Sequence, residues 1–544
     1  MRKKTLSALL CTVAAMAVLT GCGGDKKETA AAPAEGNTTA AVTEAAKTEA
    51  ETTAAAQTEA GGEKNLVMPS ASCVANLNPL LEGYKEAAML NPIYDPLYVI
   101  DVNETRYYLA DSYEVSEDGM QITVKLKEDL KWHDGEAITA DDMIFTMDVC
   151  SDTNNGAGGT NIVILNDQPV KYEKVDDLTV KVTLPMASAS YADLLGGLTL
   201  IPEHVFEGNP SVVSAGEANM KGIGSGPYKV TEFKQDEYLL LEKYEDYYMG
   251  APSIDKVTFR IISDLSAQEV ALMNGEVNFM ELANAPAVAK YEADPNFTVV
   301  KYPEGRVNYL AVNKFCETVQ DPKVVEAVFA ALNRDEIIAG AYGDGMAESA
   351  NSIFSNVNTF YDPSVEGYTQ DVEKAKQLVK ETGLDSKTLT LYFNSERVYM
   401  KESAQIIQQQ LKNVGINLEV IPLESAGFFE KVFGTDGDYE FYLNGYGAVG
   451  DPDQVVAGMY DGTWGVNLAV SDEVSQLWKD ARTVYTPEER AAIYKQIQIQ
   501  TRDELTCYPI AYPNYVFVTT SNIKGADTIK RTPVFEDYTK LTME

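Results

Sequence analysis

The segment LTLYFNSERVYMKESAQIIQQQLKNVGINLEV, residues 389–420, predicts a strand, a helix and a second strand in succession. Residues 389–393 are expected to form the first strand, and the helix has an apolar stripe at helical spacing, made by Ala404, Ile407, Leu411 and Val414. Gly415 ends this helix, and residues 416–420 alternate apolar and polar side chains, as a half-buried strand does. Such a β-α-β unit implies parallel strands joined by a right-handed crossover, so the sequence predicts an α/β layer.

The sequence before this unit predicts a further helix of the α/β layer and, nearer the N-terminus, a region of a different type. A helix is expected over residues 321–332, capped by Asp321 with Pro322 in its first turn. Further towards the N-terminus, residues 121–126 and 180–184 alternate apolar and polar side chains, which is typical of antiparallel strands. A β-rich first half followed by an α/β second half indicates at least two lobes, and a cleft between lobes is the default position for a ligand site.

The N-terminus has the features of an export signal. Basic residues at 2–4 precede an apolar run over 9–19 that is too short for a stop-transfer helix, and small residues stand directly before Cys22. This pattern resembles the lipobox of bacterial lipoproteins, in which the cysteine is acylated and becomes the new N-terminus. We therefore expect a signal peptide over 1–21, lipidation of Cys22, and attachment to the membrane through this lipid alone.

A tether and a large body follow the lipidated cysteine. Residues 23–64 are rich in Ala, Thr and Glu and hold too little apolar surface to offset the entropy of ordering, so we expect a flexible linker. The body from residue 65 to 544 is too long for one hydrophobic core and long enough for two or three.

Composition argues against several classes of function. The formal net charge is −38 at pH 7, and such a surface repels the phosphate backbone of nucleic acids. Two histidines, His133 and His204, lie in different segments and give no material for a zinc site, so neither a metal nor a cofactor is expected. Four cysteines remain in the body, and both disulfides and ordinary buried thiols are open for them: Cys73, Cys150, Cys316 and Cys507.

Two glycine-rich stretches need interpretation. Residues 445–450, GYGAVG, match the dinucleotide fingerprint formally, but Asp451-Pro452-Asp453 follows at once, so we interpret the stretch as a loop at the end of a strand. Asp451 is either the cap of a helix or an acid that faces the cleft. Residues 222–228 are expected to form a turn before a strand. No G-x-S-x-G motif occurs, and we predict that the protein is not an enzyme.

Several motifs resemble those of one transport family. In chain order they are LADSYEVSEDG (109–119), KWHDG (131–135), TADD (139–142), IPEHVF (201–206), GSGPY (224–228), NYLAVN (308–313) and the helix DPKVV (321–325) through ALNR (331–334). Together they are similar to the family-5 extracytoplasmic solute-binding proteins of peptide and nickel ABC transporters, over essentially the whole body. His133 lies in one of these motifs, which mark the fold rather than a metal site.

The resemblance implies an α/β, two-lobed periplasmic-binding-protein type II fold with an additional β-rich subdomain. Lobe I would comprise residues 65–95, 220–305 and 508–544, the β-rich subdomain residues 96–219, and lobe II residues 306–507. Ligand would enter the cleft and the lobes would close around it, as a shift of population towards the closed state. The closed form would then dock on a membrane permease that an ATPase drives.

The resemblance also bears on the cargo. Peptide binders of the family place an aspartate in the loop before the matching Asp-Pro, where it holds the ligand's ammonium, whereas this loop is one residue shorter and has Ala448 near that place. Either Asp451 or Asp453 takes over the amine, or the ligand lacks a free α-amine. Arg397 could pair with a ligand carboxylate. Aromatic candidates for the cleft are Tyr94, Tyr446 and Trp464.

The sequence thus predicts a monomeric, lipid-anchored, extracytoplasmic binding protein that delivers a small-molecule ligand, a short peptide, to an ABC permease and its ATPase. Two alternatives remain open. One is the same importer role for a non-peptide solute, such as an oligosaccharide or a metal chelate. The other is a surface adhesin or chaperone-like factor on the same fold.

Overall fold

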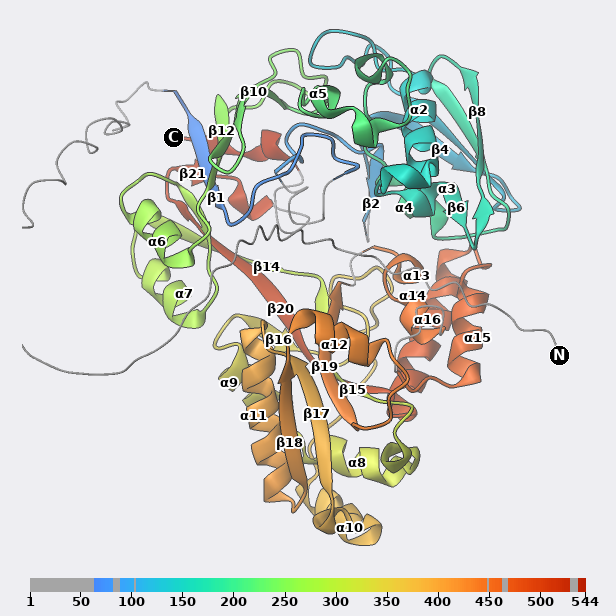
Figure 1. Ribbon diagram of the computed structural model, residues 1–544, viewed down its shortest axis with the longest axis vertical. Helices are drawn as coiled ribbons and strands as arrows, with labels where there is room; N and C mark the ends of the chain where they lie inside the picture. Colours follow the sequence, from blue (N-terminus) through green and yellow to red (C-terminus); the bar gives the residue numbers. More distant parts are fainter. Residues whose placement is uncertain (1–62, 82–88, 102–103, 448–449, 462–467, 529–536) are drawn as a thin grey trace, which may run out of the picture. The chain divides into compact units, whose positions relative to one another are not determined.

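The segment that predicts the β-α-β unit folds as expected. In the computed structural model, β17 (Thr388–Asn394), α11 (Val398–Asn413) and β18 (Asn417–Leu423) follow one another, and the two strands pair in parallel with Leu389 opposite Leu418. Helix α11 packs alongside both strands (Figure 1). The structure describes residues 63–81, 89–101, 104–447, 450–461, 468–528 and 537–544.

The β-α-β unit belongs to a sheet of eight strands. Its order is β13-β20-β15-β19-β17-β18, and β14 and β16 also pair with β20. The remaining strands of this sheet are β13 (Phe279–Glu281), β14 (Phe297–Pro303), β15 (Arg306–Val312), β16 (Ala347–Ser349), β19 (Phe441–Gly447) and β20 (Cys507–Thr520).

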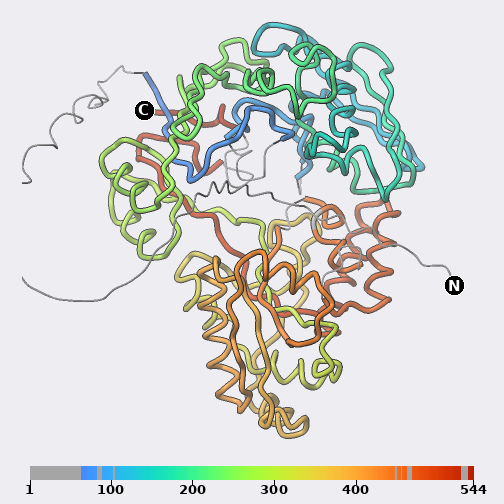
Figure 2. Tube along the Cα trace, in the orientation of Figure 1, coloured from blue at the N-terminus to red at the C-terminus, as the bar shows by residue number. Residues whose placement is uncertain are grey.

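Strand β20 links two parts of this sheet. Its first half pairs with β15 and β16, and its second half pairs with β14 and β13. Figure 2 shows it as a continuous red run near the C-terminal end of the chain. The turn between β14 and β15, at residues 304–305, lies beside β20, because the Glu304 amide donates a hydrogen bond to the carbonyl of Pro513 at 3.0 Å. The chain therefore passes between the two parts through two neighbouring backbone segments.

Two further sheets have four strands each. The first has the order β1-β12-β11-β10 and comprises β1 (Asn65–Ser70), β10 (Tyr228–Lys234), β11 (Tyr238–Lys243) and β12 (Lys256–Ile261). The second is antiparallel with the order β4-β5-β9-β8 and comprises β4 (Ala110–Val115), β5 (Gln121–Leu126), β8 (Lys171–Asp176) and β9 (Thr179–Thr183). The two alternating segments expected as antiparallel strands are thus confirmed as β5 and β9, which pair with each other.

Three two-stranded antiparallel sheets complete the described strands. They are β2 (Tyr98–Ile100) with β3 (Thr105–Tyr107), β6 (Ile164–Leu165) with β7 (Gln168–Pro169), and β21 (Ile523–Lys524) with β22 (Thr542–Met543).

The helices begin where the sequence offers caps. Thr139 and Asp142 form a reciprocal capping box at the start of α2 (Ala140–Ser151), and the Asp321 side chain caps α8 (Pro322–Ala331), as expected. The other described helices are α3 (Thr160–Val163), α4 (Tyr191–Gly196), α5 (Gly216–Asn219), α6 (Leu265–Met273), α7 (Ala285–Glu292), α9 (Arg334–Ala341), α10 (Val372–Thr382), α12 (Ser425–Val432), α13 (Pro452–Val455), α14 (Ala457–Tyr460), α15 (Asp472–Ala481) and α16 (Pro487–Asp503).

The buried apolar side chains form several cores. One core draws its buried residues from 80–212 and packs α2, α3 and α4 on the β4-β5-β9-β8 sheet. Two cores on the large sheet draw theirs from 307–512. Another unites residues near 66–94, 228–279 and 517–543. No described helix is long and apolar enough to cross a membrane.

The expected turn before β10 depends on glycine. A Cβ atom on Gly224 would lie 1.9 Å from the carbonyl oxygen of Ile93, and one on Gly226 would lie 2.7 Å from that of Pro92. Only glycine allows the two backbone segments to approach this closely. The glycines therefore serve packing, in agreement with the prediction of a turn.

Candidate ligand-binding site

Several strands of the large sheet end at one common edge. Strand β17 pairs in parallel with both β18 and β19, so the carboxyl ends of all three lie at the same edge. Strand β15 begins there, because Arg306 pairs with Gly447. In α/β sheets, ligands bind outside the carboxyl ends of the strands. This edge is therefore the candidate ligand-binding site.

Arg397 is exposed at this edge. It stands three residues after β17, at the N-cap position of α11, and the Asn394 carbonyl accepts a hydrogen bond from its amide at 3.1 Å. Within the described residues, its guanidinium has no carboxylate partner closer than 4.0 Å. Burial raises the pKa of nearby Glu304, and the charges of Arg306 and Arg397 oppose that rise. Arg397 thus presents a cation where a ligand could meet it.

Arg306 is a second cation at the edge, which the sequence analysis missed. Its Nη2 donates to the carbonyl of Gly445 at 2.7 Å, and its Nε donates to Oδ1 of Asn308 at 3.1 Å. The Nδ2 of Asn308 in turn donates to the hydroxyl of Tyr342 at 2.8 Å. The register of β15 against β19 brings Arg306 to Gly445, and the packing of α9 brings Tyr342 to Asn308, so no local motif signals this cation.

Tyr446 lies in the core beneath the edge. Its hydroxyl donates to the carbonyl of Ile353 at 2.6 Å and lies 3.1 Å from that of Tyr460, and its ring packs on Tyr309 with centroids 5.2 Å apart. Burial raises the pKa of Tyr446 well above its ordinary value. The structure therefore places this tyrosine in the framework of β19.

Asp451 is buried at the start of α13. Its carboxylate receives two hydrogen bonds from the guanidinium of Arg490, at 2.6 and 3.0 Å, and it also accepts the amide of Asp453 at 3.1 Å, which makes it the N-cap. Burial alone would lower the pKa of Arg490, but the charge and hydrogen bonds of Asp451 outweigh it and raise that pKa. Of the two roles open for Asp451, the helix cap is confirmed.

Asp453 is also held in an ion pair. Its side chain is 7% exposed, and the Nε of Arg482 donates to its Oδ1 at 2.5 Å. The Oγ of Ser190 donates to its Oδ2 at 2.8 Å. Burial raises the pKa of Asp453, and Arg482 acts in the opposite direction. Arg482 in addition binds Oδ2 of Asp461 at 2.6 Å.

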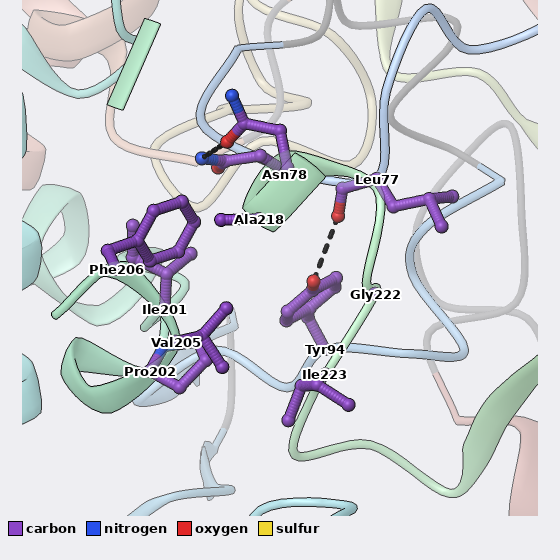
Figure 3. Close-up of a pocket in the computed structure, with 11 residues that line it drawn as sticks. Leu77, Asn78, Tyr94, Ile201, Pro202, Val205, Phe206, Ala218, Gly222 and Ile223 are labelled. Atoms are coloured by element: carbon purple, nitrogen blue, oxygen red, sulfur yellow. Dashed lines mark hydrogen bonds between the residues drawn. The ribbon is translucent and has the colours of Figure 1, made fainter. Parts of the chain in front are cut away.

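Tyr94 lies in a different part of the molecule, at a small pocket. Its hydroxyl donates to the carbonyl of Leu77 at 2.9 Å, the bond drawn in Figure 3. Apolar side chains line most of this pocket, among them Ile201, Val205 and Phe206. Burial raises the pKa of Tyr94. Trp464 and Cys22 lie outside the described residues.

Comparison with known proteins identifies the family. The family model of bacterial extracellular solute-binding proteins, family 5, matches residues 104–467. The chain belongs to this family. A dipeptide-binding protein of Escherichia coli is 27% identical over 499 residues, which cover 85% of this chain and 92% of that protein.

Solved structures of relatives agree with this result. The ABC transporter substrate-binding protein CtaP of Listeria monocytogenes has 33% identity and a TM-score of 0.82, over 88% of this chain and 99% of that one. The oligopeptide-binding protein AppA of Bacillus subtilis, solved with a nonapeptide, has 26% identity and a TM-score of 0.69, over 89% and 99% of the chains. The two-lobed α/β fold expected from the sequence is thereby confirmed.

In this family-5 protein, His133 stabilises the fold. The Nε2 of His133 donates to the carbonyl of Gly226 at 2.9 Å, and its Nδ1 accepts the amide of Gly224 at 3.2 Å. Burial lowers the pKa of His133 to about 4. Among the described residues, no group of three His, Cys, Asp or Glu side chains could hold a metal ion. His133 thus fixes the glycine turn before β10.

Proposed function

We propose that the protein is the substrate-binding subunit of an ABC importer, which captures short peptides in a cleft between its lobes and delivers them to a membrane permease. Membership of family 5, with relatives named for dipeptide and oligopeptide binding, carries this proposal. The protein would act by binding rather than by catalysis, as a monomer. An N-terminal lipid on Cys22, followed by the tether of residues 23–64, would hold it at the outer face of the cell membrane.

The segments expected from the sequence would form the two lobes and the β-rich subdomain of this binding protein. Lobe I would comprise residues 65–95, 220–305 and 508–544, the β-rich subdomain 96–219, and lobe II 306–507. Separate hydrophobic cores support this division, since one draws on 80–212 and two draw chiefly on 307–507. The latter two also include residues between 508 and 512, which favours a boundary near the middle of β20. The segment 303–306 and the middle of β20 would be the hinge, because both connect sheet regions of the two lobes.

Arg397 would receive the carboxylate of the peptide. It is exposed at the carboxyl edge of the sheet and lacks a carboxylate partner among the described residues. A planar guanidinium can hold a carboxylate through two parallel hydrogen bonds. Arg306, fixed by Gly445 and Asn308, would add positive potential at the same edge. Trp464 remains an aromatic candidate, whereas Tyr94 and Tyr446 would support the framework.

The amine of the ligand would not be held by the two aspartates at α13. Both carboxylates are engaged by arginines, Asp451 by the buried Arg490 and Asp453 by the half-buried Arg482, so an ammonium group would have to displace one of these arginines. Displacing Arg490 would leave a buried guanidinium without its carboxylate, which is strongly unfavourable. Arg482 would keep its bond to Asp461. This observation also favours the second candidate, an importer subunit for a solute without a free amine, such as an oligosaccharide or a chelate.

A melting experiment tests the proposal. The chain without signal peptide and lipid is heated with di- to hexapeptides, with the same peptides N-acetylated, and with oligosaccharides and nickel chelates. A ligand that binds only the folded protein raises its melting temperature. We expect free and acetylated peptides to stabilise the protein similarly. Stabilisation by amine-free sugars or chelates alone would overturn peptide capture and favour the second candidate. Stabilisation by free-amine peptides alone would mean that Asp451 or Asp453 binds the ligand's amine.

A further inference from the structure

A polar seam joins the β-rich part of the molecule to the helices that follow the candidate site. On one side lie Gly119 and the segment 188–193, which leads into α4. On the other side lie residues 451–454 at the start of α13 and the α15 to α16 connection, residues 482–485. The residues that meet are 258 or more positions apart in the chain.

The centre of the seam is the hydroxyl of Ser190. It donates to Oδ2 of Asp453 at 2.8 Å and accepts from Nε2 of Gln454 at 2.6 Å. Ser190 is fully buried in the described structure, so both bonds are shielded from water. Because Arg482 holds the other oxygen of Asp453, the serine meets a carboxylate whose orientation is already fixed.

Three more hydrogen bonds extend the seam. The Asp451 amide donates to Oδ2 of Asp193 at 3.0 Å, and the Ala189 amide donates to the carbonyl of Arg482 at 3.0 Å. The hydroxyl of Tyr485 donates to the carbonyl of Gly119 at 3.4 Å. A Cβ on Gly119 would lie 2.0 Å from the ring of Tyr485, so the ring rests directly on the glycine.

The seam is polar, whereas the bodies on its two sides are held by apolar cores. The core around α4 and the core around α14 to α16 share no residue. A hydrogen bond between protein groups adds only about 0.5–1.5 kcal/mol of net stability, because water replaces it when it breaks. A small polar interface between parts of one chain is expected to open and close. The seam can thus separate without unfolding either core.

The seam is also connected to the candidate site. Strand β19 ends at Gly447 on the edge that carries Arg397, and Asp451 follows four positions later. The ion pair of Asp451 with Arg490 fixes the start of α13 to α16. The seam thus includes a helix start that follows the end of β19 by four positions in the chain and is fixed to α16.

We propose that this seam, centred on Ser190, Asp453 and Gln454, is a latch that holds the two lobes together and sets the fraction of closed protein before ligand arrives. The inference rests on the proposed capture of ligand between two lobes. A binding protein whose closed state is populated in advance binds its ligand more tightly, because less of the binding free energy is used for closure. Weakening the latch shifts the unliganded protein towards the open state.

The test measures the distance between the two sides in the unliganded protein. Spin labels are attached at Lys171→Cys on β8 and Lys412→Cys on α11, both exposed, with Cys73→Ser to avoid labelling the half-buried native cysteine. The latch variant is Ser190→Ala with Gln454→Ala. The control is Ser211→Ala with Gln500→Ala, which removes a serine and a glutamine bond within one side each: Ser211 to Asp152 and Gln500 to Glu504.

We expect the ratio of closed to open protein to fall about tenfold or more in the latch variant, as the loss of two hydrogen bonds predicts, and to stay unchanged in the control. Asp193→Ala removes a different bond of the seam and should lower the same ratio. It keeps the test valid if the first variant fails to fold. Equal distance distributions in the wild type and in both seam variants would overturn the latch. Because no ligand is added, this result is independent of the melting experiment on peptides.

Discussion

The buried guanidinium of Arg490 donates two hydrogen bonds to the carboxylate of Asp451, at 2.6 and 3.0 Å. The same arginine also donates to the hydroxyl of Tyr494 at 2.9 Å and lies over the ring of Phe360, 4.9 Å from its centroid. The start of α13 is thereby tied to α16. The two acids at the start of α13, Asp451 and Asp453, are both held in ion pairs with arginines.

Asp451→Asn should destabilise the protein strongly. It removes the partner of a buried guanidinium, a change that typically costs about 3–5 kcal/mol. The urea midpoint, followed by tryptophan fluorescence, reports it, because Trp478 packs on Tyr494 with centroids 5.5 Å apart. Glu326→Gln is the control, since it breaks an exposed pair with Lys374 that should contribute at most about 1 kcal/mol. Equal midpoints for the two variants would show that Asp451 does not stabilise Arg490.

Much of the fold could be predicted from local patterns. Strands and helices with one apolar face can be recognised by the period of their apolar residues. The strands β5, β9 and β17 lie within one residue of the expected ranges, whereas α11 begins six residues before the predicted apolar stripe and β18 ends three residues beyond its expected range. Caps such as Asp321 are local as well, because the side chain bonds an amide two residues away. Strand β20 was not anticipated, although it pairs with four other strands. Its partners are distant in sequence, so no local pattern reveals them.

The candidate site was harder to predict for the same physical reason. From the sequence, Asp451 could be a helix cap or an acid facing the cleft, and Asp451 or Asp453 could bind a ligand amine, whereas their arginine partners lie 39 and 29 residues further on. Nothing in their spacing indicates that they pair. Tyr446 lies in a strand whose successive side chains point to opposite faces of the sheet. Only its packing against Tyr309 and its bond to Ile353 show that its own face is buried. The position of Arg397 at this edge of the sheet could be predicted, because a position shortly after a parallel strand is a local feature.

Arg397→Ala should weaken peptide binding by about tenfold to a hundredfold, because a charge-assisted bond to a carboxylate contributes about 1.5–3 kcal/mol. Calorimetry with a peptide that stabilises the wild type measures the loss. Lys401→Ala, an exposed cation one turn further along α11, is the control and should leave affinity unchanged. The same peptide with a C-terminal amide should bind the wild type and Arg397→Ala with equal affinity. If the amide binds the wild type as tightly as the free acid does, the ligand carboxylate is not recognised at Arg397.

Native cysteines should differ sharply in reactivity towards iodoacetamide. Cys73 is half-buried, whereas Cys150, Cys316 and Cys507 are buried, and none of the four forms a disulfide with another described residue. Burial raises the pKa of Cys150 to about 12 and that of Cys507 to about 12, which leaves almost no thiolate to react. Mass spectrometry should therefore find Cys73 modified first in the folded protein, and the other three only after denaturation. Fewer than four modified sites in these residues under denaturing, non-reducing conditions would reveal a disulfide.

Asp95 should make stability fall as pH rises. Its carboxyl group is buried and accepts hydrogen bonds from the hydroxyls of Tyr247 and Tyr248, both at 2.8 Å. Burial raises its pKa to about 7, although the two phenols, and more weakly the charge of Lys127, act in the opposite direction; Asp537 adds to the rise. The folded protein therefore holds this proton more tightly than the unfolded chain, in which the pKa of an aspartate is about 4. The stabilisation is fully present below about pH 4 and is lost as pH rises towards about 7.

Asp95→Asn isolates this effect, because an amide has the size of a protonated carboxyl and can still accept from both phenols. The free energy of unfolding of the variant minus that of the wild type should be near zero at about pH 4. It should grow by an amount on the order of 1.4 kcal/mol for each unit of pKa shift, and level off above about pH 7. Urea titrations of both proteins at several pH values measure this difference, and all other titrating groups cancel in it. A difference that does not change between pH 4 and 8 would mean that Asp95 is ionised at its ordinary pKa in the folded protein.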